Sequence, residues 1–229
     1  MAAHDDPLYL DNCVEGCAHG HQRLLALLDG VMAANDGRDA ESWFSAPSLL
    51  PDWTRRHVVA HLARNAESHV HLFSEAEAGR EGDQYPGGAE ARNAGIGSYV
   101  ALDAADLVAR NRAAIYALEA KWARTSADAW QGAGRNTIGV RVKMRDLPML
   151  RWREVEVHTA DLGAGITFLD WNPLYVRYDL PRMTMMQTSR TPMGMSKLPE
   201  AALRLPESER LAWLLGRHVP AGLEPLQGF

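Results

Sequence analysis

Four long segments of this sequence repeat apolar residues with the period of an α-helix, and this pattern constrains the fold more than any other feature. The segments are residues 8–34, 54–79, 98–123 and 146–165. A spacing near 3.6 residues places apolar side chains on one stripe of each helix, and that stripe must be buried against a neighbour. No regular alternation of strands and helices interrupts them. We therefore expect a mainly α protein in which residues 1–165 form an up-and-down four-helix bundle.

The remaining residues have a different character. Residues 167–199 are dense in Pro, Met, Trp and Tyr and show no sustained period. The stretch SERLAWLLGRHVPAGL predicts a short helix that ends at Gly216 or Pro220. Residues 136–148 alternate apolar and polar side chains enough to indicate extended structure, and the fourth helix then starts at Asp146. We expect residues 166–229 to form a small C-terminal domain of mixed α/β structure.

The charges exclude some classes of partner. The chain carries 29 acidic and 24 basic residues, interspersed, with a net charge of −5. No basic stripe is therefore present to bind a phosphate backbone, and no apolar run approaches the roughly 18 residues of a membrane span. The N-terminus lacks the basic flank of a signal peptide. We expect a cytoplasmic protein that binds neither nucleic acid nor membrane; no pattern indicates its oligomeric state.

The two cysteines, Cys13 and Cys17, lie four residues apart on one face of the first predicted helix. This spacing does not close a disulfide loop, so we expect both thiols to be reduced. They are interpreted as small buried hydrophobic residues, with a redox or metal-binding pair as the alternative.

The stretch WREVEVHTADLGAG contains an acid and an imidazole at helical spacing. Glu154 and His158 are four residues apart, so both side chains can reach one cation beside their helix. Asp161 lies near the same face. Glu154 could instead form a surface ion pair with Arg151 or Arg153.

A third ligand has to come from another helix. The stretch HVVAHLARN places His57, His61 and Asn65 in one row, and His61 lies near the middle of its helix. Two histidines and one carboxylate leave coordination positions open, as in catalytic zinc sites and other divalent sites. His57 is better suited to a capping or solvated role, and His69 and His71 are weaker candidates.

Three motifs occur in order: LLPDWTRRHVVAHLARNAESH, YPGGAEARNAGI and LRWREVEVHTADLGAG. Over residues 8–165 the chain thereby resembles the N-terminal domain of the mycothiol-dependent maleylpyruvate isomerase family, which belongs to the DinB-like metal-binding four-helix bundles. The resemblance implies that His61, Glu154 and His158 bind the metal. The argument from helix faces selects the same three residues.

The resemblance also implies roles outside the metal triad. The C-terminal stretch LAWLLGRH resembles the end of the family's second domain, so that Arg217 would be the catalytic arginine reaching toward the metal pocket. Arg64, Asn65 and Arg92 are further candidates near the bound thiol and substrate. Arg217 could instead be a partner of a helix dipole. Tyr85 and Arg92 could line the entrance or pin a surface loop.

The implied activity is the cis–trans isomerisation of maleylpyruvate, a small dicarboxylate, to fumarylpyruvate in gentisate breakdown. A thiolate adds to the double bond, the central bond rotates, and elimination of the thiol leaves the trans isomer. A divalent metal, expected to be zinc, would assist an external thiol. The family implies mycothiol, although the residues do not distinguish it from glutathione or bacillithiol.

Two alternatives share the metal triad. The first is a thiol S-transferase that conjugates a low-molecular-weight thiol to other electrophiles. The second is a non-catalytic metal-binding bundle whose partners bind the methionine-rich stretch RMTMMQTSRTPMGM.

Overall fold

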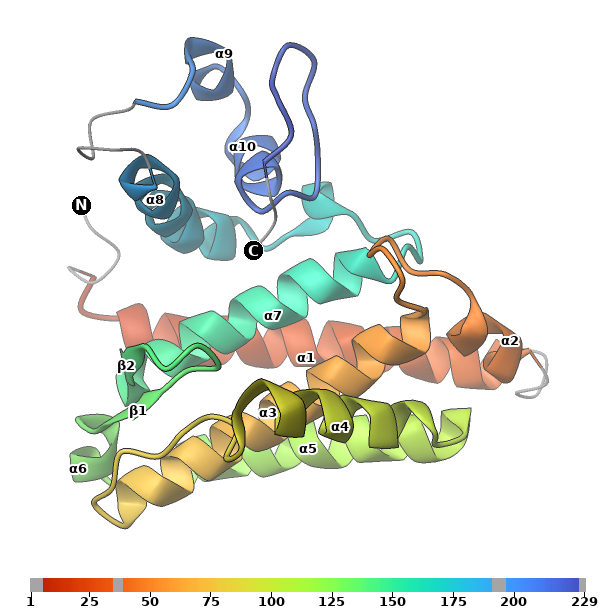
Figure 1. Ribbon diagram of the computed structural model, residues 1–229, viewed down its shortest axis with the longest axis vertical. Coiled ribbons are helices and arrows are strands. Elements are labelled where there is room, and N and C mark those ends of the chain that lie inside the picture. The colour runs from red at the N-terminus through yellow and green to blue at the C-terminus, as the bar shows by residue number, and fades with distance from the viewer. Residues whose placement is uncertain (1–5, 35–38, 191–196, 227–229) are drawn as a thin grey trace.

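The computed structural model describes residues 6–34, 39–190 and 197–226, and their regular structure is almost entirely helical (Figure 1). The expectation of a mainly α protein is therefore confirmed. In chain order the elements are α1 (Tyr9–Ala33), α2 (Ala40–Ser45), α3 (Arg55–Glu77), α4 (Gly88–Val100), α5 (Ala104–Arg124), α6 (Ala127–Trp130), β1 (Ala133–Arg135), β2 (Arg141–Lys143), η3 (Met144–Asp146), α7 (Leu147–Asp161), η4 (Phe168–Asp170), α8 (Pro173–Ser189), α9 (Glu200–Leu203) and α10 (Glu207–Leu214).

Helices α1, α3, α5 and α7 form the four-helix bundle, but their order is not up-and-down. Near the starts of α3 and α5, Arg56 donates to the carbonyl of Leu102, and just past their ends Ser126 N donates to Glu77 at 2.7 Å. These two helices are therefore parallel. The short helix α4 returns the chain between them, which makes the expected up-and-down connectivity wrong.

Helix α4 lies mostly between the second and third predicted segments, where we predicted no helix. Only Ile96 of its residues is buried, so the helix lacks a long apolar stripe that could reveal it in the sequence. Gly87, with φ of 90°, precedes it. The third long helix then starts at Ala104 instead of residue 98, because the side chain of Asp103 caps it by accepting from Asp106 N at 2.8 Å.

Helices α1 and α7 pack so closely that one glycine is required between them. A Cβ atom built on Gly16 would lie 2.2 Å from the ring of Trp152, which is fully buried. Gly20 faces Val155 one turn further on, so these two helices are also parallel. The glycines that interrupt the apolar pattern of the first helix thus allow the close approach of α7.

The C-terminal part packs against α7 on the side away from α3 and α5 (Figure 1). Arg153 of α7 forms a buried ion pair with Asp179 of α8, and Trp171 Nε1 donates to the carbonyl of Glu156 at 3.0 Å. Helix α8 was not predicted, because it contains Pro181 and a proline normally ends a helix. The two strands found among the described residues, β1 and β2, lie before α7, so the described part of residues 166–229 is helical and the expected mixed α/β structure is not found there. The domain boundary at residue 165 stays a prediction.

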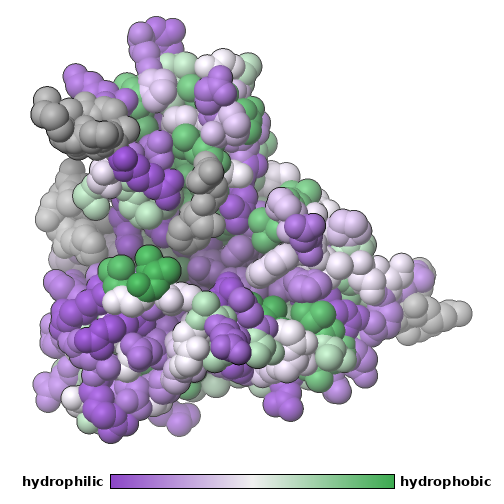
Figure 2. All heavy atoms as spheres, in the orientation of Figure 1, coloured by the Kyte–Doolittle hydropathy of each residue, from purple (hydrophilic) through white to green (hydrophobic). Residues whose placement is uncertain are grey.

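The extended structure expected within residues 136–148 is confirmed only for β2, which pairs with the preceding strand β1 in an antiparallel hairpin, whereas residues 136–140 form its turn. Asn136 Oδ1 accepts from the backbone N–H groups of Ile138 and Val140 at 3.2 and 2.9 Å and so fixes the turn. Ile138 is 81% exposed. Figure 2 shows an apolar group of side chains over this hairpin.

Among the described residues, no helix combines the length and the apolarity that a membrane crossing demands. The expectations of a cytoplasmic location and of no nucleic-acid partner stay predictions. Part of the methionine-rich stretch, residues 191–195, lies outside the described residues.

Candidate metal centre

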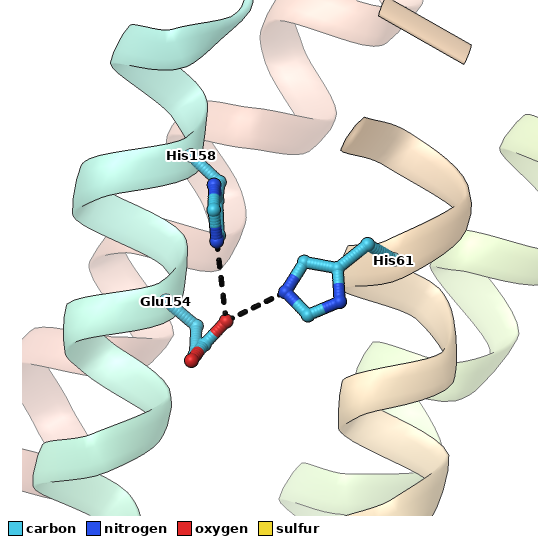
Figure 3. Close-up of side chains that lie close together, drawn as sticks. All are labelled: His61, Glu154 and His158. Atoms are coloured by element: carbon cyan, nitrogen blue, oxygen red, sulfur yellow. Dashed lines mark hydrogen bonds and ion pairs between the residues drawn. The ribbon is translucent and has the colours of Figure 1, made fainter. Parts of the chain in front are cut away.

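The three side chains predicted to bind a metal converge between α3 and α7 (Figure 3). His61 Nε2 lies 2.7 Å from Glu154 Oε2, and His158 Nε2 lies 3.4 Å from the same oxygen. One ligand atom from each residue lies within 4.8 Å of the other two. Residues that are 93 positions apart in the chain thus form one cluster.

The local sequence explains this convergence. Helix α7 starts with Pro148 in its first turn and places Glu154 and His158 on one face, four residues apart. Helix α3 starts after Thr54, whose backbone N–H donates to His57 Nδ1 at 3.3 Å. His57 therefore has the capping role considered from the sequence. One turn later, His61 faces α7.

Burial and mutual hydrogen bonds set the charges of the three ligands. Burial raises the pKa of Glu154, but the hydrogen bonds from His158 and His61 outweigh it and hold this pKa well below its usual range. Burial lowers the pKa of His61 to about 4. Burial also acts to lower the pKa of His158, yet hydrogen bonds to Asp161 and Glu154 raise it to about 8. A carboxylate beside two imidazoles provides the donor set of a divalent metal site.

A second layer of polar groups orients the imidazoles. Asp161 Oδ2 lies 2.8 Å from His158 Nδ1, which turns His158 Nε2 toward Glu154. Arg217 holds Asp161 in turn, with Nε 2.9 Å from Oδ1 and Nη2 3.1 Å from Oδ2. Arg92 Nη2 lies 3.3 Å from His61 Nδ1. This outer layer is typical of metal-binding histidines, and the residues present fit a metal.

The surface ion pairs considered as an alternative for Glu154 do not form. Arg153 is buried with Asp179, and the fully buried Arg151 donates to the carbonyl of Leu62 and to Asn65. The partners of these two arginines come from α1, α3 and α8, so no spacing within the fourth helix could identify them.

The triad lies in the wall of a cavity of ≈ 630 Å³. Its lining residues are Leu50, Pro51, Trp53, His61, Asn65, His69, Gln84, Tyr85, Arg92, Asn136, Thr137, Ile138, Leu147, Leu150, Glu154, His158 and Arg217. Five further candidates therefore reach the cavity, namely Asn65, His69, Tyr85, Arg92 and Arg217. Sequence reasoning missed the loop and hairpin residues of this list, because their positions depend on turns and have no helical period.

Arg64 lies elsewhere. Its guanidinium is paired with Glu67 and lies 5.3 Å from the centre of the Tyr99 ring. It lines a separate, smaller pocket together with His71 and Ser68. The position of Arg64 contradicts its expected place beside the metal pocket, because at the residue before Asn65 the α3 side chain turns to a different face of the helix.

The two cysteines are buried in the core, as expected from their spacing. Burial raises the pKa of Cys13 to about 12 and also raises the pKa of Cys17. Neither residue lines the cavity. At neutral pH neither side chain is a thiolate, so neither can serve as a nucleophile in the cavity.

Known proteins resemble this chain in sequence and in fold. The sequence profile of the family described as "Mycothiol maleylpyruvate isomerase N-terminal domain" matches residues 17–163. Curated protein sequences give no significant match.

Two crystal structures share the fold over nearly the whole chain. One is of the mycothiol-dependent maleylpyruvate isomerase, and the other is of a mutant of that enzyme in which one histidine is replaced by alanine. Each has a TM-score of 0.81 and 26% sequence identity, covering 95% of this chain and 92% of the other. The profile match spans more than half of the sequence, and the chain therefore belongs to the mycothiol maleylpyruvate isomerase N-terminal domain family.

Proposed function

We propose that this protein is a metal- and thiol-dependent isomerase that converts maleylpyruvate to fumarylpyruvate. The observation that carries the proposal is the convergence of His61, Glu154 and His158 in the wall of a cavity large enough for a small dicarboxylate beside a thiol. The likeness to a mycothiol-dependent maleylpyruvate isomerase along 95% of the chain supports it.

A divalent metal held by His61, Glu154 and His158, which we expect to be zinc, would supply a Lewis acid and lower the pKa of a bound thiol. The chain's own residues would hold this site in place. Glu154 contributes the negative charge, and Asp161 keeps His158 Nε2 directed at the site.

The nucleophile has to come from outside the protein, because Cys13 and Cys17 are buried and protonated. A thiolate forms a C–S bond at one carbon of the cis double bond, and the electron pair moves to the adjacent carbonyl as an enolate. The central bond then rotates. Return of the electron pair re-forms the double bond in the trans geometry and expels the thiolate, so no atom is gained or lost.

The cavity walls would support these steps by their apolar side chains. Trp53, Leu147 and Leu150 provide apolar surface that limits water around the enolate. The family's name and the similar structures support mycothiol as the thiol.

The direct test is to mix the purified, zinc-loaded protein with maleylpyruvate and to follow the loss of its ultraviolet absorbance. We expect turnover with mycothiol, slower or no turnover with glutathione, and none without a thiol. Fumarylpyruvate should accumulate. A stable thioether in place of fumarylpyruvate would identify an S-transferase, and the absence of any thiol-dependent reaction would contradict both enzymatic proposals.

Replacement of the ligands tests the metal site separately from the substrate. Glu154→Gln and His61→Ala should each abolish stoichiometric zinc, measured by elemental analysis, and lower turnover by roughly 10³-fold or more. His57→Ala is the matched control, because His57 caps α3 one turn from His61 and should leave the zinc content unchanged. Zinc retained in both ligand variants would contradict the triad.

A further inference from the structure

Arg151 is a fully buried arginine that has no carboxylate partner among the described residues. Its Nε donates to His21 Nε2 at 3.1 Å, and its Nη1 donates to the carbonyl of Leu62 at 2.8 Å and to Asn65 Oδ1 at 2.9 Å. Its Nη2 has no partner in the described part of the chain. The nearest link to an acid passes through His21, whose Nδ1 lies 2.8 Å from Glu119 Oε1.

A buried guanidinium is costly unless it is paired, so its positive charge acts strongly on whatever lies nearby. Asn65 is the group between Arg151 and the cavity. Because Asn65 Oδ1 accepts from Arg151, the amide presents its Nδ2 hydrogens on the other side. Asn65 follows His61 by four residues on α3, and hence its amide lies about 6 Å along the helix from the metal ligand.

Two arginines line the cavity, and only one of them is paired with a carboxylate. The guanidinium of Arg217 donates to both carboxylate oxygens of Asp161. Arg92 contacts only neutral groups in the described structure, with Nη1 3.2 Å from Asn93 Oδ1 and Nη2 3.3 Å from His61 Nδ1. The fork of Arg92 therefore remains available to an anion, whereas that of Arg217 does not.

We propose that Asn65 and Arg92, with Arg151 behind Asn65, bind a carboxylate group of the substrate one helical turn from the metal triad. This inference rests on the proposed function and specifies which residues bind a carboxylate of its substrate. Arg92 supplies a charged donor and Asn65 supplies a neutral donor polarised by Arg151. This subsite would not increase the affinity for an electrophile that lacks a carboxylate. Arg217 acts through Asp161, as a positioning residue for His158.

The test is calorimetric binding of succinate, an unreactive dicarboxylate, to the zinc-loaded full-length protein. We expect Arg92→Gln to weaken succinate binding about tenfold or more, and Arg92→Lys to restore part of it. Asn65→Asp should abolish binding without lowering the melting temperature, because the new carboxylate is isosteric with the amide and pairs with Arg151. Arg112→Gln is the control and should bind like wild type, because Arg112 lies near the middle of α5, pairs with Asp29 and does not line the cavity.

Further measurements distinguish whether the subsite binds the carboxylate of the substrate or that of the thiol. Glutathione also carries carboxylates, so competition between glutathione and succinate would assign the subsite to the thiol and overturn the proposal. Succinate binding that is unchanged in Arg92→Gln and Asn65→Asp would also overturn it, since the carboxylate would then be bound by zinc alone. Failure of the proposed isomerase reaction would leave these binding differences intact, whereas failure of the subsite would leave turnover intact with an unchanged KM in both variants.

Discussion

The four-helix bundle and the C-terminal part contribute very differently to the candidate site. Helices α3 and α7 supply all three predicted ligands, whereas the C-terminal part supplies one cavity-lining residue, Arg217. Arg217 contacts Asp161 and not the triad itself. The bundle can therefore form the metal site, and the C-terminal part adjusts the orientation of His158 through Asp161.

Breaking the buried ion pair between Arg153 of the bundle and Asp179 of the C-terminal part should have the largest effect on stability. Arg153→Met leaves Asp179 as an unpaired buried carboxylate and should lower the free energy of unfolding by about 3–5 kcal/mol, measured by urea denaturation. The double variant Arg153→Met with Asp179→Leu should recover most of this loss. Glu200→Gln breaks an exposed pair with Arg204 in the same region and should have little effect. If Glu200→Gln lowered the free energy of unfolding as much as Arg153→Met does, the larger contribution of the buried pair would be contradicted.

Asp161 tests the contact through which the C-terminal part acts on the metal site. Asp161→Asn should lower zinc affinity by about 10–100-fold, because the hydrogen bond that orients His158 loses its charge. Arg217→Met should shift affinity in the same direction by less, since Asp161 keeps its contact with His158. Competition with a chelating dye measures both, and circular dichroism checks that the helices remain. An unchanged affinity in both variants would show that the bundle holds the metal without help.

Acid should act on the bundle through its buried histidines. Burial lowers the pKa of His21 to about 4 and that of His69 to about 3, from an ordinary value of 6.5. Below pH 6.5 the unfolded chain therefore binds more protons than the folded one, and stability falls as the pH falls. Each histidine should cost about 1 kcal/mol between pH 7 and pH 5.5.

His69→Gln removes one of these two groups. In metal-free protein its urea midpoint should fall less between pH 7 and pH 5.5 than that of wild type. An identical fall in the two proteins would mean that His69 is charged in the folded state.

The two regions also differ in how far their structure follows from local sequence. Glu154 and His158 could be paired from the sequence because four residues within one helix always share a face. His61 could be added because it lies in the middle of a second amphipathic helix. Helix α8 could not be predicted, because it contains Pro181, has a mixed composition and packs against α7 and α10, which are distant in the sequence. Helix α4 escaped for a related reason, since only Ile96 of its residues is buried.

The sequence by itself determined the four main helices, their buried faces and the three converging metal-ligand candidates, because helical periodicity depends on neighbours within one segment. Only the tertiary structure decided which arginine is paired and which is free. Arg153, Arg217 and Arg151 look alike in the sequence, yet Arg153 pairs with Asp179, Arg217 pairs with Asp161, and Arg151 has no carboxylate partner within residues 6–34, 39–190 and 197–226. A buried charge is stabilised by groups from distant segments, and no local pattern records where those groups meet.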